Sequence, residues 1–307
     1  MPPENRQESA TLPNSFYSRL YWFIVAISAF GLYLTKYLPF HDLPNHLARY
    51  YVLTRDADLA STKDLYSVHF GLTPNLGVDI ISTVLGRFID PALVVRGLLL
   101  IALGAWSLGI YLLSVRRNDG RCSPVIFFAP LMFFNVSVLM GYLNFAFAAS
   151  FIPLIYCFAE TIEAPRKRAI FLFITVLLTY FGHMMASLII LALMFYKGFV
   201  ERKSPVGKAT LAASALVTVL IGILFKIGSV ASETKQWRFT TPLNKLWLIR
   251  SAFEVGPKLY LCTSILFGIL ALLFVFRVVK LKRDDLPVIL FFLVLFLICP
   301  YGLELVM

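Results

Sequence analysis

The sequence predicts an all-α protein, a polytopic bundle of about nine transmembrane helices that forms a single domain over residues 1–307. Two observations support this prediction. Of the 307 residues, 59% are hydrophobic and only 15% are charged, a composition unlike that of soluble domains. Apolar runs that approach the roughly 20 residues of a spanning helix also recur along the whole chain. A water-soluble fold is therefore excluded.

The apolar runs give the expected spans in order. They lie at residues 20–38, 92–115, 123–140, 142–160, 169–182, 184–197, 209–226, 258–276 and 286–302. The fifth and sixth runs are shorter than a usual span, so together with Gly182 and His183 they form either a tight hairpin or one overlong helix. The hairpin is favoured because it keeps the basic loops that follow on one side of the membrane.

The net charge of +11, from 28 Lys+Arg against 17 Asp+Glu, would suggest a nucleic-acid partner in a soluble chain. In a membrane protein, basic residues in short loops instead mark the cytoplasmic side. With a cytoplasmic N-terminus, all the short basic loops fall on that side: Arg116–Arg121, 166–168, Lys197–Lys208 and Arg277–Arg283. We therefore expect a cytoplasmic N-terminus, an outer C-terminus and no nucleic acid as partner.

The first outer loop, residues 39–91, contains two predicted amphipathic surface helices. Asp42 precedes the first, over 43–54, and shares one side of it with His46 and Arg49. These residues form either an ionisable site or, respectively, a helix cap, an interfacial histidine and a ligand of lipid phosphate. In the second stretch, 76–89, Asp79 is either a further site carboxylate or a surface aspartate, solvated or paired with Arg87.

Further polar residues on the outer side are candidates for lining a cavity. Tyr142 and Asn144 lie between the third and fourth spans, where they either line the cavity or cap the fourth helix. His183 lies at the hairpin apex and is otherwise a simple turn residue. In the second outer loop, 227–257, Arg238 and Arg250 flank a proline turn and are candidates to bind a phosphate. The alternative is that this basic, aromatic loop contacts ordinary lipid headgroups.

Several short elements resemble the GT-C superfamily of integral-membrane glycosyltransferases, in a bacterial branch. They are the Asp42-x-Pro44-x-His46 element, residues 66–76, residues 141–145 and Gly182-His183. The resemblance implies a polyprenyl-phosphate-linked sugar as donor and an acceptor at the outer face of the bacterial inner membrane. It also implies that Asp42 is the catalytic base or a carboxylate associated with a divalent cation, and that His46 and His183 line the cavity.

Superfamily members commonly have eleven or more spans, so a chain of nine spans is a minimal member, a truncated product or an inactive copy. Two other functions remain open, a transporter or lipid-binding protein and a non-catalytic partner subunit. A transporter would place ionisable groups at mid-membrane. The acidic residues here cluster instead at the span ends and in the loops, which favours a site at the surface.

Overall fold

The computed structural model describes residues 14–35, 38, 40–54, 72–134, 138, 141–229, 235–237 and 303–305. In these ranges the chain is helical apart from two strands of three residues each, β1 (Lys235–Trp237) and β2 (Leu303–Leu305). Four helical segments are long and apolar enough to cross a membrane: Ser15–Leu34, Pro91–Arg117, Leu143–Thr161 and Pro205–Ile227. By length and composition, these helices indicate a membrane protein with several spans. The predicted spans 258–276 and 286–302, with Arg238 and Arg250, lie outside the described residues.

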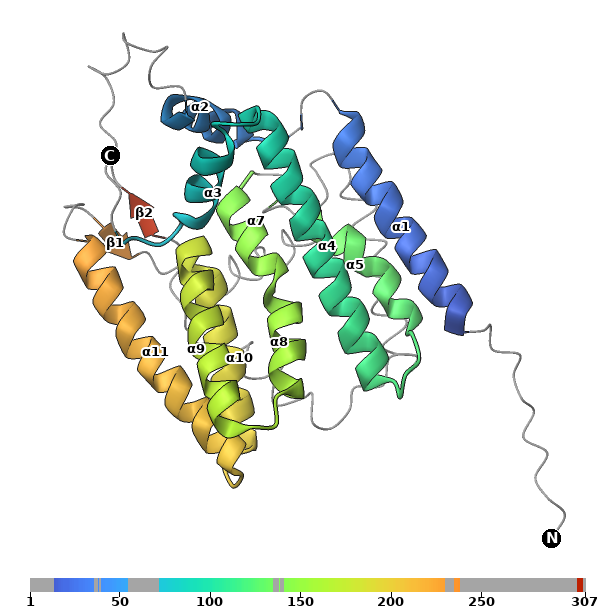
Figure 1. Ribbon diagram of the computed structural model, residues 1–307, viewed down its shortest axis with the longest axis vertical. Helices are drawn as coiled ribbons and strands as arrows, with labels where there is room; N and C mark the ends of the chain where they lie inside the picture. The colour runs from blue at the N-terminus through green and yellow to red at the C-terminus, as the bar shows by residue number, and fades with distance from the viewer. Residues whose placement is uncertain are drawn as a thin grey trace, which may run out of the picture.

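The long helices run side by side, as Figure 1 shows. They are α1 (Asn14–Leu34), α4 (Pro91–Arg117), α7 (Leu143–Ser150) continued by α8 (Ile152–Thr161), α9 (Pro165–Gly182), α10 (Met184–Val200) and α11 (Pro205–Ser229). A helix occupies each of the two amphipathic stretches of the first outer loop. Helix α2 (Leu43–Thr54) lies across one end of the bundle beside α3 (Gly77–Leu85), which is shorter than the expected 76–89.

Two of the expected spans are not one uninterrupted helix. Residues 123–140 were expected to form one helix, but the chain forms a 3₁₀ helix, η2 (Pro124–Phe128), then α5 (Ala129–Phe133) and a turn at Phe134. Pro130 lacks the N–H that would continue the preceding turn as an α-helix. In the fourth span, Pro153 follows a one-residue turn at Phe151 that separates α7 from α8. Phe151 keeps right-handed helical angles, so Leu143–Thr161 still forms one segment long enough to span.

The chain turns at His183, as the hairpin alternative predicts. His183 has extended backbone angles (φ −166, ψ 128) between the end of α9 and the start of α10. Helices α9, α10 and α11 then pack around one buried apolar cluster that includes Val176, Ile190 and Val217. A second apolar cluster joins α2, α3, α4 and α7 through residues such as Tyr50, Val78 and Leu99.

Ion pairs gather the ends of four helices at one end of the bundle. Glu160, at the end of α8, contacts Arg117 of α4 at 3.1 Å and Lys197 of α10 at 3.0 Å. Glu201, just after α10, contacts Lys197 at 3.1 Å and Arg168 of α9 at 3.2 Å. The basic loops that follow α4, α8 and α10 therefore lie at the same end, as their common charge predicts.

The outer surface of the long helices is apolar. On α1, Phe23 and Phe30 are 62% and 58% exposed, and on α11 Leu216 and Val219 are 60% and 61% exposed. Exposed apolar side chains along spanning helices are expected where the surrounding medium is lipid. The short strands β1 and β2 pair antiparallel, with Gln236 opposite Glu304.

Reporter fusions test the orientation. The described basic loops lie together at one end, and the sequence around Lys282 is equally basic. Fusions after Arg117, Arg168 and Lys282 should therefore all report the cytoplasm, and a fusion after Gly141 should report the outer side. Reporter activity in intact cells gives the side at each point. An outer signal at Arg168 would refute the order of the early spans, and one at Lys282 would refute the later spans.

Candidate functional site

Helix α2 is fixed to the bundle on its apolar side. Leu43 and Tyr50 are buried, at 4% and 0% exposure. The hydroxyl of Tyr51 donates to both carboxylate oxygens of Asp90, at 3.0 and 2.9 Å. Asp90 also accepts from the N–H of Ala92 and so caps the first turn of α4. These contacts hold the polar side of α2 in one position at the end of the bundle.

Asp42 lies where α2 meets the turn that precedes α7. Gly141 has φ +83, and a Cβ atom added there would lie 2.9 Å from the backbone nitrogens of both Asp42 and Leu43. Only glycine accepts this conformation and this approach without strain. The two described partners of the Asp42 carboxylate are side chains, Asn45 Nδ2 at 2.7 Å and His46 Nε2 at 3.4 Å. The carboxylate is 39% exposed.

Asp79 has the opposite environment. Its side chain is 1% exposed and its Oδ2 lies 2.5 Å from Nη2 of Arg49, which is half-exposed. Burial raises the pKa of Asp79, and the Arg49 guanidinium opposes this shift. The expectation of a solvated or Arg87-paired aspartate is therefore wrong, because the partner comes from α2 and the carboxylate is inside the protein.

His46 is a neutral neighbour of Asp42. Its side chain is 15% exposed. Burial lowers its pKa below the usual value, although the carboxylates of Asp42 and Asp79 act in the opposite direction. When Nε2 carries the proton of the neutral ring, it donates toward Asp42 and orients that carboxylate. Asp42 therefore has polar neighbours, Asn45 and His46, that leave its negative charge in place.

His183 belongs to the same end of the bundle through a chain of close contacts. A Cβ atom at Gly77, the first residue of α3, would lie 3.1 Å from the Cα of Gly182. The ring of His183 packs edge-on against Phe145, with centroids 5.1 Å apart. Its Nδ1 accepts from the N–H of Met185 at 3.2 Å, so His183 caps α10. Burial lowers its pKa to about 4, and the ring is neutral at physiological pH.

Tyr142 and Asn144 have different environments in the structure. Tyr142 immediately precedes α7, is 55% exposed and makes no side-chain capping hydrogen bond. Asn144 lies within the first turn of α7 and is 9% exposed. Among the described residues, its Oδ1 has no hydrogen-bond donor. Tyr142 therefore occupies the N-cap position of α7 through its backbone, whereas Asn144 lies inside the helix and is not its cap.

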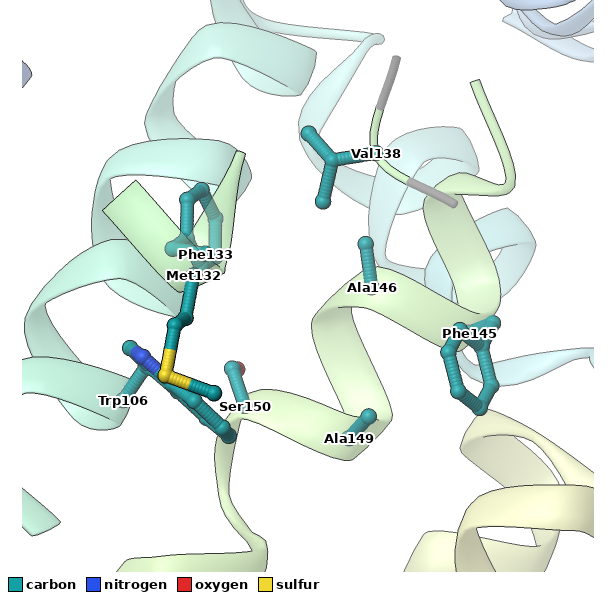
Figure 2. A pocket seen from close by; sticks show the side chains of 8 residues that line it. All are labelled: Trp106, Met132, Phe133, Val138, Phe145, Ala146, Ala149 and Ser150. Carbon is teal, nitrogen blue, oxygen red and sulfur yellow. The ribbon is translucent and has the colours of Figure 1, made fainter. Parts of the chain in front are cut away.

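Figure 2 shows a small cavity between α4, α5 and α7. Its volume is about 40 Å³, and it is lined mainly by apolar side chains: Trp106, Met132, Phe133, Val138, Phe145, Ala146, Ala149 and Ser150. This is far below the 300 Å³ or more typical of ligand pockets. Asp42, His46 and the other candidates do not line it. We therefore regard it as a packing defect between Trp106 and Phe145.

Sequence reasoning missed three contributors to this site. Tyr50 and Ser82 are fully buried at 0% exposure, and burial raises the pKa of the Tyr50 hydroxyl. Tyr51 binds Asp90. Their amphipathic helix positions are visible in the sequence, but their partners are not. In the part of the chain that the structure describes, no group of three or more His, Cys, Asp or Glu residues could hold a metal ion.

Comparison with known proteins adds no relative: no family model, curated protein or solved structure matches this chain.

The contact between Gly141 and Asp42 can be tested by adding a single Cβ atom. Gly141→Ala should lower the free energy of unfolding by about 1 kcal/mol for the positive φ and by a further 1–3 kcal/mol or so for overpacking against Asp42. The control is Gly120→Ala, which has a similar φ of +81 and no heavy atom near its Cβ position. Thermal unfolding in detergent measures the stability of both variants. An equal loss of stability in the two would contradict the close contact between Gly141 and Asp42.

The buried pair of Arg49 and Asp79 predicts a pH-dependent defect. Arg49→Gln leaves the Asp79 carboxylate buried without its cation, which should cost about 1–3 kcal/mol of stability. Because the folded-state pKa of Asp79 is already raised, ionisation costs stability as the pH rises through that range, and losing Arg49 enlarges this cost. The variant should therefore be nearer to wild type at pH 5 than at pH 8. Arg87→Gln is the control. A similar pH-dependent loss of stability in this variant would show that Arg87, and not Arg49, is the partner of Asp79.

Proposed function

We propose that this protein is a membrane glycosyltransferase of the GT-C type. It would move a sugar from a polyprenyl-phosphate-linked donor to an acceptor at the outer face of the bacterial inner membrane. Asp42 would be the catalytic base. The proposal rests on the resemblance of the Asp42-x-Pro44-x-His46 element and on the environment that the fold gives to Asp42.

The difference between two carboxylates of one loop supports the choice of Asp42. Asp79 is 1% exposed and paired with Arg49, so its charge is neutralised inside the protein. Asp42 is 39% exposed and contacts the neutral groups of Asn45 and His46. A general base must be accessible and must keep its negative charge until it takes the proton. Asp42 meets both requirements, whereas Asp79 is buried and its charge is already engaged by Arg49.

In this mechanism the acceptor hydroxyl lies beside the Asp42 carboxylate. As the hydroxyl oxygen attacks the anomeric carbon, its proton passes to the carboxylate and the bond to the polyprenyl phosphate breaks, so that the phosphate leaves with the bonding pair. His46 and Asn45 orient the carboxylate from one turn of α2. Arg238 and Arg250 remain the candidates for binding the leaving phosphate, with Tyr142, Asn144 and His183 at the rim.

The orientation that this function needs follows from the two ends of the bundle. The end with the basic loops would face the cytoplasm, and the end with α2 would face outward. Helix α3 exposes Ile80 and Val84 at 46% and 54%, and Phe88, just after the helix, is 83% exposed. Helix α3 would therefore lie in the interface with this side toward lipid. Asp42 would then lie at the outer membrane surface, within reach of lipid-linked donors.

The replacement Asp42→Asn tests the assignment. Asn keeps the shape and the capping ability of Asp but cannot take the proton, so transfer should fall by about 10²-fold or more while folding is preserved. The assay is release of radiolabelled sugar from a polyprenyl-phosphate hexose by the full chain in proteoliposomes. The matched control is Asp119→Asn, an exposed aspartate in the turn after α4.

Unchanged transfer by the Asp42 variant would reject Asp42 as the base. A wild-type protein that releases sugar from no such donor would instead favour the transporter, lipid-binding or partner-subunit alternatives.

A further inference from the structure

The turn between α10 and α11 contains a hollow of about 370 Å³, lined by Val200, Glu201, Arg202, Lys203 and Ser204. The hollow is open on its outer side and is formed by five consecutive residues, so it is suited to a headgroup that stays partly exposed. It lies at the end of the bundle where the basic loops gather, opposite to the end that carries α2. We propose that this hollow binds the phosphate of an anionic phospholipid from the adjoining leaflet.

The acidic residue in the hollow does not oppose an anion there. Glu201 is shared between Lys197 at 3.1 Å and Arg168 at 3.2 Å, so two cations face one carboxylate. Arg168 is itself only 4% exposed, and its Nε and Nη2 have no hydrogen-bond partner among the described residues. Lys197 also contacts Glu160 at 3.0 Å, and Glu160 contacts Arg117 at 3.1 Å. The ion-pair network beside the hollow therefore holds three cations against two carboxylates, before Arg202 and Lys203 are counted.

Arg202 is held in an orientation that suits a phosphate. Its guanidinium lies over the ring of Phe199, 4.4 Å from the centroid. One of its nitrogens, Nη1, donates to the carbonyl oxygen of Phe199 at 3.1 Å. Stacking on an aromatic ring fixes the plane of an arginine and leaves its other N–H groups free for bidentate contacts to phosphate oxygens. The exposed ammonium group of Lys203, the next residue, adds a second cation.

The turn is rigid, so the hollow does not need to form on binding. The hydroxyl of Ser204 donates to the carbonyl of Glu201 at 3.0 Å and accepts from the N–H of Gly207 at 3.0 Å. A Cβ atom at Gly207 would lie 2.0 Å from the Glu201 carbonyl oxygen, which shows how closely α11 begins against the turn. A preformed site loses little conformational entropy when it binds a ligand.

Apolar neighbours favour a lipid over free phosphate. Phe199 and Val200, directly before the hollow, are 58% and 57% exposed. Exposed apolar side chains that precede a basic turn are suited to contact acyl chains while the cations contact the headgroup. The proposal depends on the membrane location of the chain and not on sugar transfer, so either can fail without the other.

Lipid-dependent thermal stability of the full-length protein in detergent tests the site. Titration with dioleoylphosphatidylglycerol should raise the Tm of the wild type, and dioleoylphosphatidylcholine should raise it much less. In the double variant Arg202→Gln, Lys203→Gln the concentration of phosphatidylglycerol for half the effect should increase about tenfold or more, because two phosphate contacts are lost. Arg202→Lys, which keeps the charge and loses the fork, should fall between the two.

The matched control is Arg166→Gln, Lys167→Gln, an exposed basic pair at the start of α9 on the same end of the bundle. It removes the same charge and should bind phosphatidylglycerol as the wild type does. Equal weakening in both double variants, or an equal response to both lipids, would overturn the proposal. Stabilisation by the same concentrations of inorganic phosphate would show that the site takes a free phosphate and would overturn the lipid assignment.

Discussion

The lipid surroundings are the constraint on which the arrangement of this protein depends. In water a polar stripe faces outward, whereas in lipid polar groups must find partners within the protein. Helix α3 shows the consequence: Asp79 and Ser82 are buried at 1% and 0%, while Phe88, just after the helix, is 83% exposed. The sequence correctly predicts that α3 is amphipathic. In the structure, however, its polar side faces the bundle and not the solvent.

Different interactions stabilise each of the two ends of the bundle. At one end, Glu160 and Glu201 join the ends of α4, α8, α9 and α10 through four contacts of 3.0–3.2 Å. Partly buried networks of this kind fix the relative positions of helices. At the other end the backbones approach directly, at Gly141 against Asp42 and at Gly77 against Gly182.

Much of the local structure could be predicted from the sequence, because it depends on neighbouring residues. Asp42 followed by Pro44 marks the start of α2, and the short apolar runs around His183 mark the hairpin. The predictions that were wrong concern the effect of proline on the backbone and contacts between residues far apart in the chain. Pro130 divides the third span although its neighbours are apolar throughout. Asp79 pairs with Arg49, thirty positions earlier in the chain, and nothing in the local pattern distinguishes this partner from Arg87.

The pairing of Asp79 also explains how Asp42 acquires its environment. An unpaired carboxylate at 1% exposure would be costly, so Arg49 must reach α3, and this fixes the rotation of α2 about its axis. With this rotation, and with Leu43 and Tyr50 buried, His46 lies one helical turn after Asp42 and on the same side of α2. Because Arg49 is engaged by Asp79, it does not neutralise Asp42. A structural ion pair at one carboxylate therefore leaves the other carboxylate charged and accessible.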